Sequence, residues 1–178
     1  MKKTLSLLMI IFFAISDSHA QSHKIEFAIG PEFSVPTFSG ISSSGIGGGT
    51  YLEYFLNKKL AVTGDISVNY FKGNIFDFFK NDTISGFIIM PVLAGGKYFF
   101  TDKFYAAASA GLIIGLRNAG NHLALSPGAG IMIPFSATSA IDIGVKLIGV
   151  PRGYSFSENS FLNKGGYSFL TFRIAYVF

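Results

Sequence analysis

GYSFLTFRIAYVF, residues 166 to 178, is the stretch that decides the fold. Successive side chains of a β-strand point to opposite faces, so residues of one parity share a face. One parity is apolar throughout; it consists of Leu170, Phe172, Ile174, Tyr176 and Phe178. The other parity is mixed and carries a charge at Arg173. The stretch therefore predicts an amphipathic strand, whose apolar face must meet either a protein core or lipid.

The composition of the chain favours lipid. Hydrophobic residues make up 49% of the 178 residues and charged residues only 13%, whereas a soluble domain carries about 25% charged residues. After residue 20, no uninterrupted apolar run reaches the roughly 20 residues that a membrane-spanning helix needs. A strand that crosses a membrane in a barrel needs an apolar residue only at every second position. A transmembrane β-barrel fits both observations.

The first twenty residues have the parts of a secretory signal peptide. Lys2 and Lys3 give the positive start, residues 5–15 form the apolar run, and Ser18-His19-Ala20 is a small-x-small cleavage site. We expect residues 1–20 to be removed and residues 21–178 to form one domain. The chain has no Cys, which excludes a disulfide framework and a lipidated cysteine. Its formal net charge of +4 is too small and too dispersed to indicate nucleic-acid binding.

Alternating segments recur along the mature chain, most cleanly between Leu60 and Tyr70. We predict strands at residues 24–33, 46–55, 60–70, 83–100, 104–116, 123–135, 140–148 and 166–178. Pro91 cannot donate to a strand ladder, so we predict a β-bulge there. The connections alternate between long and short, as expected when one barrel end faces the periplasm and the other faces the outside. The long ones are predicted at residues 34–45, 71–82, 117–122 and 149–165.

The final strand, with its alternating aromatics and C-terminal Phe178, resembles the closing strand of outer-membrane β-barrels. The likeness is to the small OmpX/OmpA-type barrels, including the "outer membrane protein beta-barrel domain" group of Bacteroidota. It implies an all-β fold, an eight-stranded antiparallel up-and-down transmembrane barrel in the outer membrane of a Gram-negative cell. It also implies a signal for the barrel-assembly machinery at Phe172, Ile174, Tyr176 and Phe178. We expect a monomer surrounded by outer-membrane lipid and lipopolysaccharide.

If the apolar parity faces lipid, the charged parity must fill the lumen. Eight strands leave an interior that side chains fill, and an isolated charge inside would cost several kcal/mol. Glu32 shares this parity. We predict a paired lumenal charge network; its members are Glu26, Glu53, Asp65, Lys97, Asp142, Lys146 and Arg173. The network either plugs the barrel, which we favour, or forms a charged constriction for a solute.

The sequence offers little for catalysis or cofactor binding. Of the histidines, His23 and His122 remain after signal removal, and no spacing of His, Asp and Glu suggests a metal site. The glycine-rich residues 40–49 lack the Lys-Ser/Thr of a phosphate loop. His122 and Ser126 are a base and a nucleophile of the type a lipid A deacylase or acyltransferase uses. They lie four positions apart on one strand, about 13 Å at 3.3 Å per residue, so we expect no enzyme and no cofactor.

Three functions remain open at this point. The leading one is an integral outer-membrane barrel with a structural, adhesive or surface-interaction role carried by its long loops. The alternative is a narrow porin or transport channel for small solutes. A further alternative is a soluble lipocalin-like ligand binder, in which the apolar parity would line a cavity and the charged parity would face water.

Overall fold

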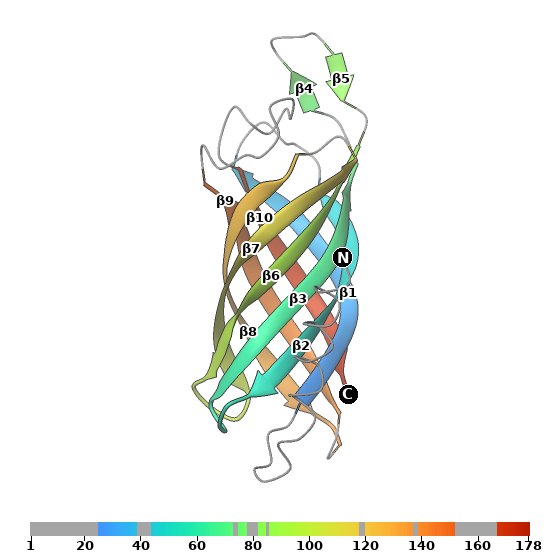
Figure 1. Ribbon diagram of the computed structural model, residues 1–178. Coiled ribbons are helices and arrows are strands. Elements are labelled where there is room, and N and C mark those ends of the chain that lie inside the picture. Colours follow the sequence, from blue (N-terminus) through green and yellow to red (C-terminus); the bar gives the residue numbers. More distant parts are fainter. Residues whose placement is uncertain are drawn as a thin grey trace, which may run out of the picture.

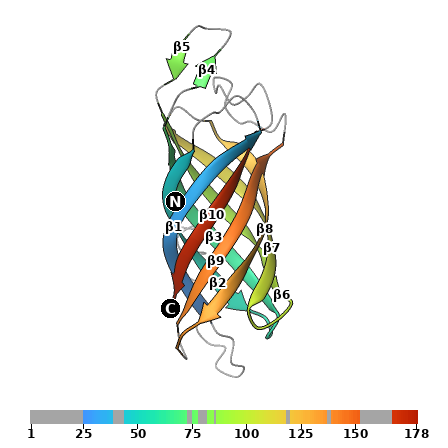
Figure 2. The same cartoon turned by 180° about the vertical axis from the view of Figure 1, so that it is seen from behind.

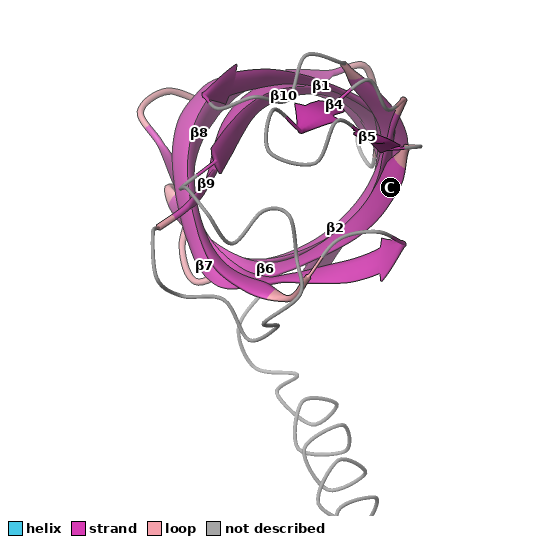
Figure 3. Cartoon of the chain, turned by 90° about the horizontal axis from the view of Figure 1, so that it is seen from above, coloured by secondary structure: helices cyan, strands magenta, loops and turns pink. Residues whose placement is uncertain are grey.

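The computed structural model describes residues 25–38, 44–72, 75–77, 82–84, 86–117, 120–136, 139–151 and 167–178. The strands are β1 (Ile25–Phe38), β2 (Gly45–Phe55), β3 (Leu60–Phe71), β4 (Ile75–Asp77), β5 (Asp82–Ile84), β6 (Phe87–Phe99), β7 (Phe104–Arg117), β8 (His122–Pro134), β9 (Ala140–Val150) and β10 (Tyr167–Val177). Eight of them close into an antiparallel barrel in the order β1-β10-β9-β8-β7-β6-β3-β2 (Figures 1 and 2). The view from above shows the closed ring (Figure 3). The predicted fold is confirmed.

The two ends of the barrel differ as the connection lengths predicted. The β4–β5 hairpin stands beyond one end, which we call the upper end, and the short turns lie at the other, lower end (Figure 1). Those turns are closed by backbone bonds such as Leu56 N to Leu60 O at 2.9 Å and Phe100 N to Phe104 O at 2.9 Å. Phe178 N donates to Phe27 O at 2.9 Å, which joins the end of the chain to its first strand at the lower end. Among the described residues, no helix is long and apolar enough to cross a membrane.

Most predicted strand boundaries agree with the structure to within two residues, but two are wrong by four or five residues. β1 continues to Phe38, five residues beyond the predicted end at Phe33, because Ser34 and its successors still pair with β10. The inward Ser34 shares a hydrogen bond of 2.9 Å with Thr171 of β10. β6 starts at Phe87 rather than Thr83, since residues 82–84 pair with residues 75–77 in the β4–β5 hairpin. The segment predicted as a polar loop at 71–82 therefore contains a strand. The predicted signal peptide lies outside the described residues.

The bulge predicted at Pro91 is also wrong. In the β3–β6 ladder, Ile66 pairs with Val92 and Asn69 pairs with Ile89, and pairing is interrupted between them. The register is the same on both sides of the interruption, so neither strand has an extra residue at Pro91. The missing N–H of proline explains a lapse on one side, and Pro91 still pairs with Ile113 on the other. Pairing is interrupted in the same way at Pro31 in the β1–β10 ladder and at Pro127 in the β8–β9 ladder. The register shift of β6 falls instead between Ile88 and Ile89, in its pairing with β7.

The apolar parity faces outward along the whole barrel. Phe172, Ile174 and Phe178 of the closing strand are 47%, 56% and 55% exposed. Aromatic rings gather on the outer face at the lower end, where Tyr176 contacts Phe178 edge-on at 4.7 Å and Phe135 at 5.6 Å. The lipocalin-like alternative required the reverse arrangement, with the apolar parity around a cavity, so the geometry excludes it.

The lumen is filled in layers. An upper apolar cluster contains Phe71, Phe87, Ile89, Leu93, Ile113, Ala124, Ile148, Val150, Tyr167 and Phe169. Phe71 is stacked on Phe87 at 4.6 Å and also contacts Phe169 at 4.7 Å. A lower cluster contains Ala28, Tyr51, Phe99, Tyr105, Met132, Ala140, Ala175 and Val177. Charged side chains begin at the level of the lower cluster, where Asp142 is paired in register with Met132 and Ala175, and they extend upward to Glu32.

Candidate functional site

Asp142 is the centre of the lumenal charge network. It lies on the inward parity of β9 and is 0% exposed. Tyr51 and Tyr105 donate their hydroxyl groups to its carboxylate at 2.5 and 2.6 Å. Lys97 Nζ and Arg173 Nη2 each lie 3.3 Å from Asp142 Oδ2. Four donors from four different strands therefore converge on one carboxylate.

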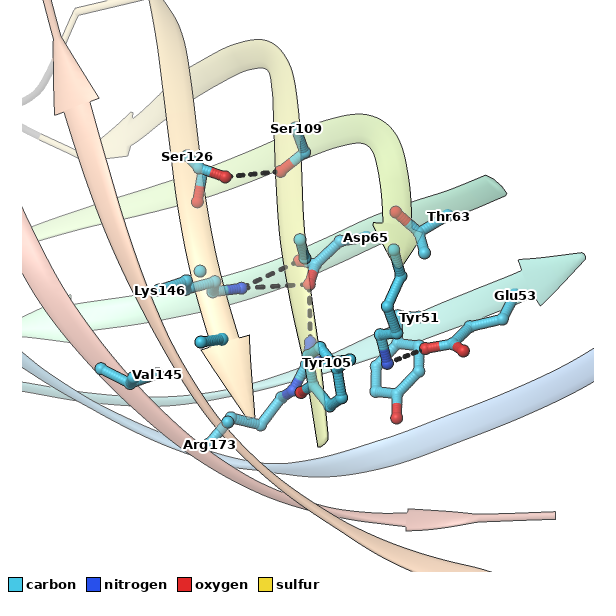
Figure 4. Close-up of a pocket in the computed structure, with 15 residues that line it drawn as sticks. Tyr51, Glu53, Thr63, Asp65, Tyr105, Ser109, Ser126, Val145, Lys146 and Arg173 are labelled. Atoms are coloured by element: carbon cyan, nitrogen blue, oxygen red, sulfur yellow. Dashed lines mark hydrogen bonds and ion pairs between the residues drawn. The ribbon is translucent and has the colours of Figure 1, made fainter. Parts of the chain in front are cut away.

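Asp65 is the second acidic centre and is shared by two cations. Arg173 Nη1 donates to its Oδ2 at 2.8 Å, and Lys146 Nζ lies 3.1 Å from the same oxygen. Figure 4 shows both cations pointing at Asp65 from the opposite side of the lumen. Arg173 thus bridges Asp65 to Asp142, so the two centres form one network that ties β3, β9 and β10 across the barrel. Charge-assisted hydrogen bonds of this kind are stronger than neutral ones.

Lys97 anchors the lower end of the network. It is 2% exposed and forms an ion pair with the fully buried Glu53 as well as with Asp142. Its ammonium also lies 4.0 Å from the ring centroid of Tyr105 and 4.8 Å from that of Tyr51. The Arg173 guanidinium also lies over the Tyr51 ring, 4.0 Å from its centroid. Both tyrosines thus contribute a hydroxyl donor and an aromatic face.

Glu32 extends the network toward the upper end. Lys146 Nζ lies 2.7 Å from its Oε1, and Asn69 donates to its Oε2 at 3.1 Å. Asn69 also donates to Ser67 at 3.3 Å. Parity predicts that Glu32 lies in the lumen, but Glu32 is not among the predicted members of the network. Its parity was the available signal, because every member of the network lies on the inward face.

Glu26 is the last predicted member of the network, whereas Tyr51 and Tyr105 belong to the network without having been predicted. Glu26 is buried on the inward face of β1, paired in register with Glu53. The ion pairs around Lys97, Lys146 and Arg173 link Glu53, Asp65, Asp142 and Glu32. Tyr51 and Tyr105 were missed as members of the network. Inward parity could have indicated Tyr51, but nothing in the sequence links Tyr105 to a carboxylate 37 positions away.

A small cavity of about 50 Å³ lies beside the network (Figure 4). One side is formed by the charged and aromatic groups, and the other by small residues of β7 to β9, including Ala107, Ser109, Ser126 and Gly128. Ser109 Oγ donates to the Ser126 backbone oxygen at 3.3 Å. A water molecule needs at least about 10–15 Å³ by this kind of measure. The cavity therefore has room for a few water molecules or a small ion.

His122 and Ser126 are both buried on the inner face of β8. Among the described residues, neither His122 Nε2 nor Ser126 Oγ has a hydrogen-bond partner. The His122 ring instead packs edge-on against Tyr167 at 5.4 Å. Within the described part of the chain, no group of three His, Cys, Asp or Glu side chains is arranged to hold a metal ion.

Glycines make room for Tyr105 in the lumen. A Cβ built on Gly144 would lie 2.7 Å from the Tyr105 hydroxyl, with its other neighbours at 3.8 Å or more. We predict that Gly144→Ala displaces Tyr105 from Asp142 and lowers the free energy of unfolding by about 1.5–3 kcal/mol, as expected for a lost hydrogen bond to a charged group. Urea-induced unfolding of the detergent-solubilised barrel measures the change.

Gly64→Ala is the matched control for this substitution. A Cβ at Gly64 meets nothing within 4 Å, and Gly64 also lies in mid-strand, so the added methyl group is the same. Gly64→Ala should leave the urea midpoint within error or raise it slightly. Equal midpoints for Gly144→Ala and Gly64→Ala would show that Tyr105 adds no stability through Asp142.

Comparisons with known proteins agree on the architecture. No protein-family model matches the chain, and no curated protein matches it. Among solved structures, it is similar to Neisserial surface protein A, with a TM-score of 0.62 and 12% identity over 88% of this chain and 98% of that one. The chain has the fold of the small outer-membrane β-barrels.

Two further structures with this barrel fold are similar over nearly their whole length. Ail, the attachment invasion locus protein of Yersinia pestis, has a TM-score of 0.54 and 15% identity over 89% of this chain and 100% of that one. The outer membrane protein AlkL, solved in lipid bilayers, has a TM-score of 0.51 and 12% identity over 90% and 93%. At these identities the comparisons establish the barrel fold alone.

Proposed function

We propose that this protein is an integral outer-membrane barrel that does not conduct solutes and that displays its long connections at the cell surface for structural or adhesive contacts. The observation that carries the proposal is the inverted distribution of polarity. Large apolar side chains cover the outside, while the lumen holds a paired charge network together with two apolar clusters. Such a barrel is stable in lipid and blocked to solutes.

The blocked lumen follows from how tightly the network is bonded. Lys97 and Asp142 are 2% and 0% exposed, and the Phe71–Phe87–Phe169 cluster lies above them. A solute crossing the barrel would have to separate buried ion pairs in a low-dielectric interior and also displace stacked aromatic rings. Each step costs several kcal/mol. Function then rests with the connections at the upper end, which we place outside the cell. The similarity to Ail, named as an attachment protein, supports an adhesive role for them.

The C-terminal residues Phe172, Ile174, Tyr176 and Phe178 fit a role in assembly. All four lie exposed on the outer face of the closing strand. They are accessible before β10 pairs with β1 and remain on the lipid-facing surface afterwards. We assign them to recognition by the barrel-assembly machinery, and we place the mature protein in the outer membrane as a monomer. His122 and Ser126 have no catalytic role in this proposal.

The experiment for this proposal is a planar bilayer recording on the refolded mature barrel. We expect no stepwise current, with insertion verified by a difference in gel mobility between boiled and unboiled samples. A narrow channel is the second candidate, because a cavity of about 50 Å³ lies within the lumen. Discrete conductance steps that appear with the wild-type barrel and are absent from protein-free detergent controls would establish that channel instead.

A further inference from the structure

A β-bulge at the upper end of β7 changes the direction of Arg117. Inward and outward residues alternate along β7, and Arg117 has the same parity as the fully buried Ile113. A regular strand would therefore direct Arg117 into the lumen. In the pairing with β6, however, Ile89 lies opposite Gly115 while Ile88 lies opposite Arg117. Leu116 is the extra residue, and a bulge of this kind redirects the side chain that follows it.

The shifted register places Arg117 on the outside of the barrel. Directly paired residues of antiparallel strands share a face, and Ile88 lies on the outward parity between the buried Phe87 and Ile89. Both Leu116 and Arg117 are exposed. Had Arg117 pointed inward, it would have entered the upper apolar cluster around Ile113. The bulge therefore avoids a buried unpaired charge and presents a guanidinium on the outer surface.

Lys72 lies on the same outer surface as Arg117, two strands away. It follows Phe71 at the end of β3, continues the outward parity of Tyr70, and is exposed. Tyr70 pairs with Ile88, which pairs with Arg117, so the three residues form one row across β3, β6 and β7. Strands are about 4.8 Å apart, which puts Tyr70 and Arg117 roughly 10 Å apart along the row. Lys72 lies two residues beyond Tyr70 at about 3.3 Å per residue, so it lies roughly 12 Å from Arg117. Lys and Arg side chains at this separation can reach a common anion.

The position of Lys72 and Arg117 on the barrel indicates which kind of anion they would bind. Within the described barrel strands and their flanking residues, Lys72 and Arg117 are the charged side chains exposed at the upper end. They lie at the rim of the apolar outer face, where Tyr70, 43% exposed, marks the boundary between acyl chains and headgroups. At that height the available anions are lipid phosphates, and the planar guanidinium binds phosphate in bidentate fashion.

We propose that Lys72 and Arg117 form a binding site for the phosphate groups of an anionic glycolipid in the outer leaflet. The inference rests on the proposed placement of the upper end outside the cell. It adds a specific lipid contact to a barrel that otherwise meets the bilayer through apolar side chains. Tyr70 supports the contact by packing against the sugar or the upper acyl chain.

The test is native mass spectrometry of the folded mature barrel titrated with bis-phosphorylated lipid A and, separately, with the same lipid after removal of its phosphates. We expect the phosphorylated form to bind more tightly to the wild-type barrel. Each cation near an anionic lipid surface contributes about a five-fold gain in affinity, so K72A/R117A should bind roughly 25-fold more weakly. K72R/R117K keeps both charges and should stay within a few-fold of wild type.

The matched control is K58A/K59A, which removes two exposed lysines from the β2–β3 turn at the lower end. This variant loses the same net charge and should bind lipid A as the wild type does. Equal loss in both double variants, or no preference for the phosphorylated lipid, would overturn the site. Gel mobility confirms folding of every variant. A silent bilayer recording together with unchanged lipid binding in K72A/R117A would reject this site and leave the proposed function intact.

Discussion

Replacing Asp142 with Ala is expected to lower the free energy of unfolding by about 3–5 kcal/mol, the usual effect of removing one partner from a buried ion-pair network. Asp142 accepts hydrogen bonds from Tyr51 and Tyr105 and lies 3.3 Å from nitrogens of both Lys97 and Arg173. Its removal takes one of two acidic partners from Lys97 and one of two from Arg173, and it leaves the buried hydroxyl groups of two tyrosines without their acceptor. The measurement is the urea midpoint of the detergent-solubilised barrel, followed by the fraction with folded gel mobility.

Two controls separate charge from shape in this experiment. Asp142→Asn keeps the volume and an acceptor for one tyrosine while removing the charge, so its loss of stability should fall between Asp142→Ala and wild type. Asp102→Ala removes an exposed acid from the short β6–β7 turn, where the expected effect is within about 0.5 kcal/mol. If Asp142→Ala unfolded at the same urea concentration as Asp102→Ala, the lumenal network would not be a source of stability.

The barrel could be predicted from sequence because two-residue periodicity is a local property. In the closing strand, each outward residue from Leu170 to Phe178 is visible as an apolar position without knowledge of its neighbours. The strand ends were less certain. Ser34 is a polar residue beside a glycine-rich segment, and only its pairing with β10 and its bond to Thr171 show that β1 continues there.

The network was predictable in its membership but not in its connections. Parity alone assigns Lys97, Lys146 and Arg173 to the lumen, and burial then requires acidic partners. Which acid meets which cation depends on the stagger between strands, since Lys146 reaches Asp65 across 81 positions of sequence and Arg173 reaches it across 108. The tyrosines are a separate case. Tyr105 enters the network because Gly130 and Gly144 have no side chains to occupy its position, which is a packing effect between strands.

The bulge illustrates the same limit. Pro91 was a reasonable site for an irregularity, because proline lacks the donor that a ladder requires. The structure shows that loss of one donor is accommodated by a lapse in one ladder, with no change in register. The actual shift lies where a regular strand would have buried Arg117 in an apolar cluster. The position of the register shift thus follows from the cost of burying the Arg117 charge, and that cost depends on the assembled lumen.

A lysine at the middle of the outer face is expected to be nearly as damaging as the loss of Asp142. Ile66 lies midway along β3, is 49% exposed and points outward. A lysine on the lipid face at the bilayer midplane costs about 2–4 kcal/mol in transmembrane barrels, because its charge must leave water. We therefore expect Ile66→Lys to lower the free energy of unfolding in lipid bilayers by that amount, measured by urea titration of the barrel refolded into vesicles.

Ile46→Lys provides the depth control for Ile66→Lys. Ile46 is 67% exposed and pairs with Tyr70, four residues above Ile66 on β3. At about 3.3 Å per residue and a strand tilt near 40°, this corresponds to roughly 10 Å along the bilayer normal, close to the edge of an apolar band about 25 Å tall. The cost at Ile46 should therefore fall to about 0–1 kcal/mol. Equal costs at the two positions would mean that the outer face does not lie in lipid, since in water both lysines would be solvated alike.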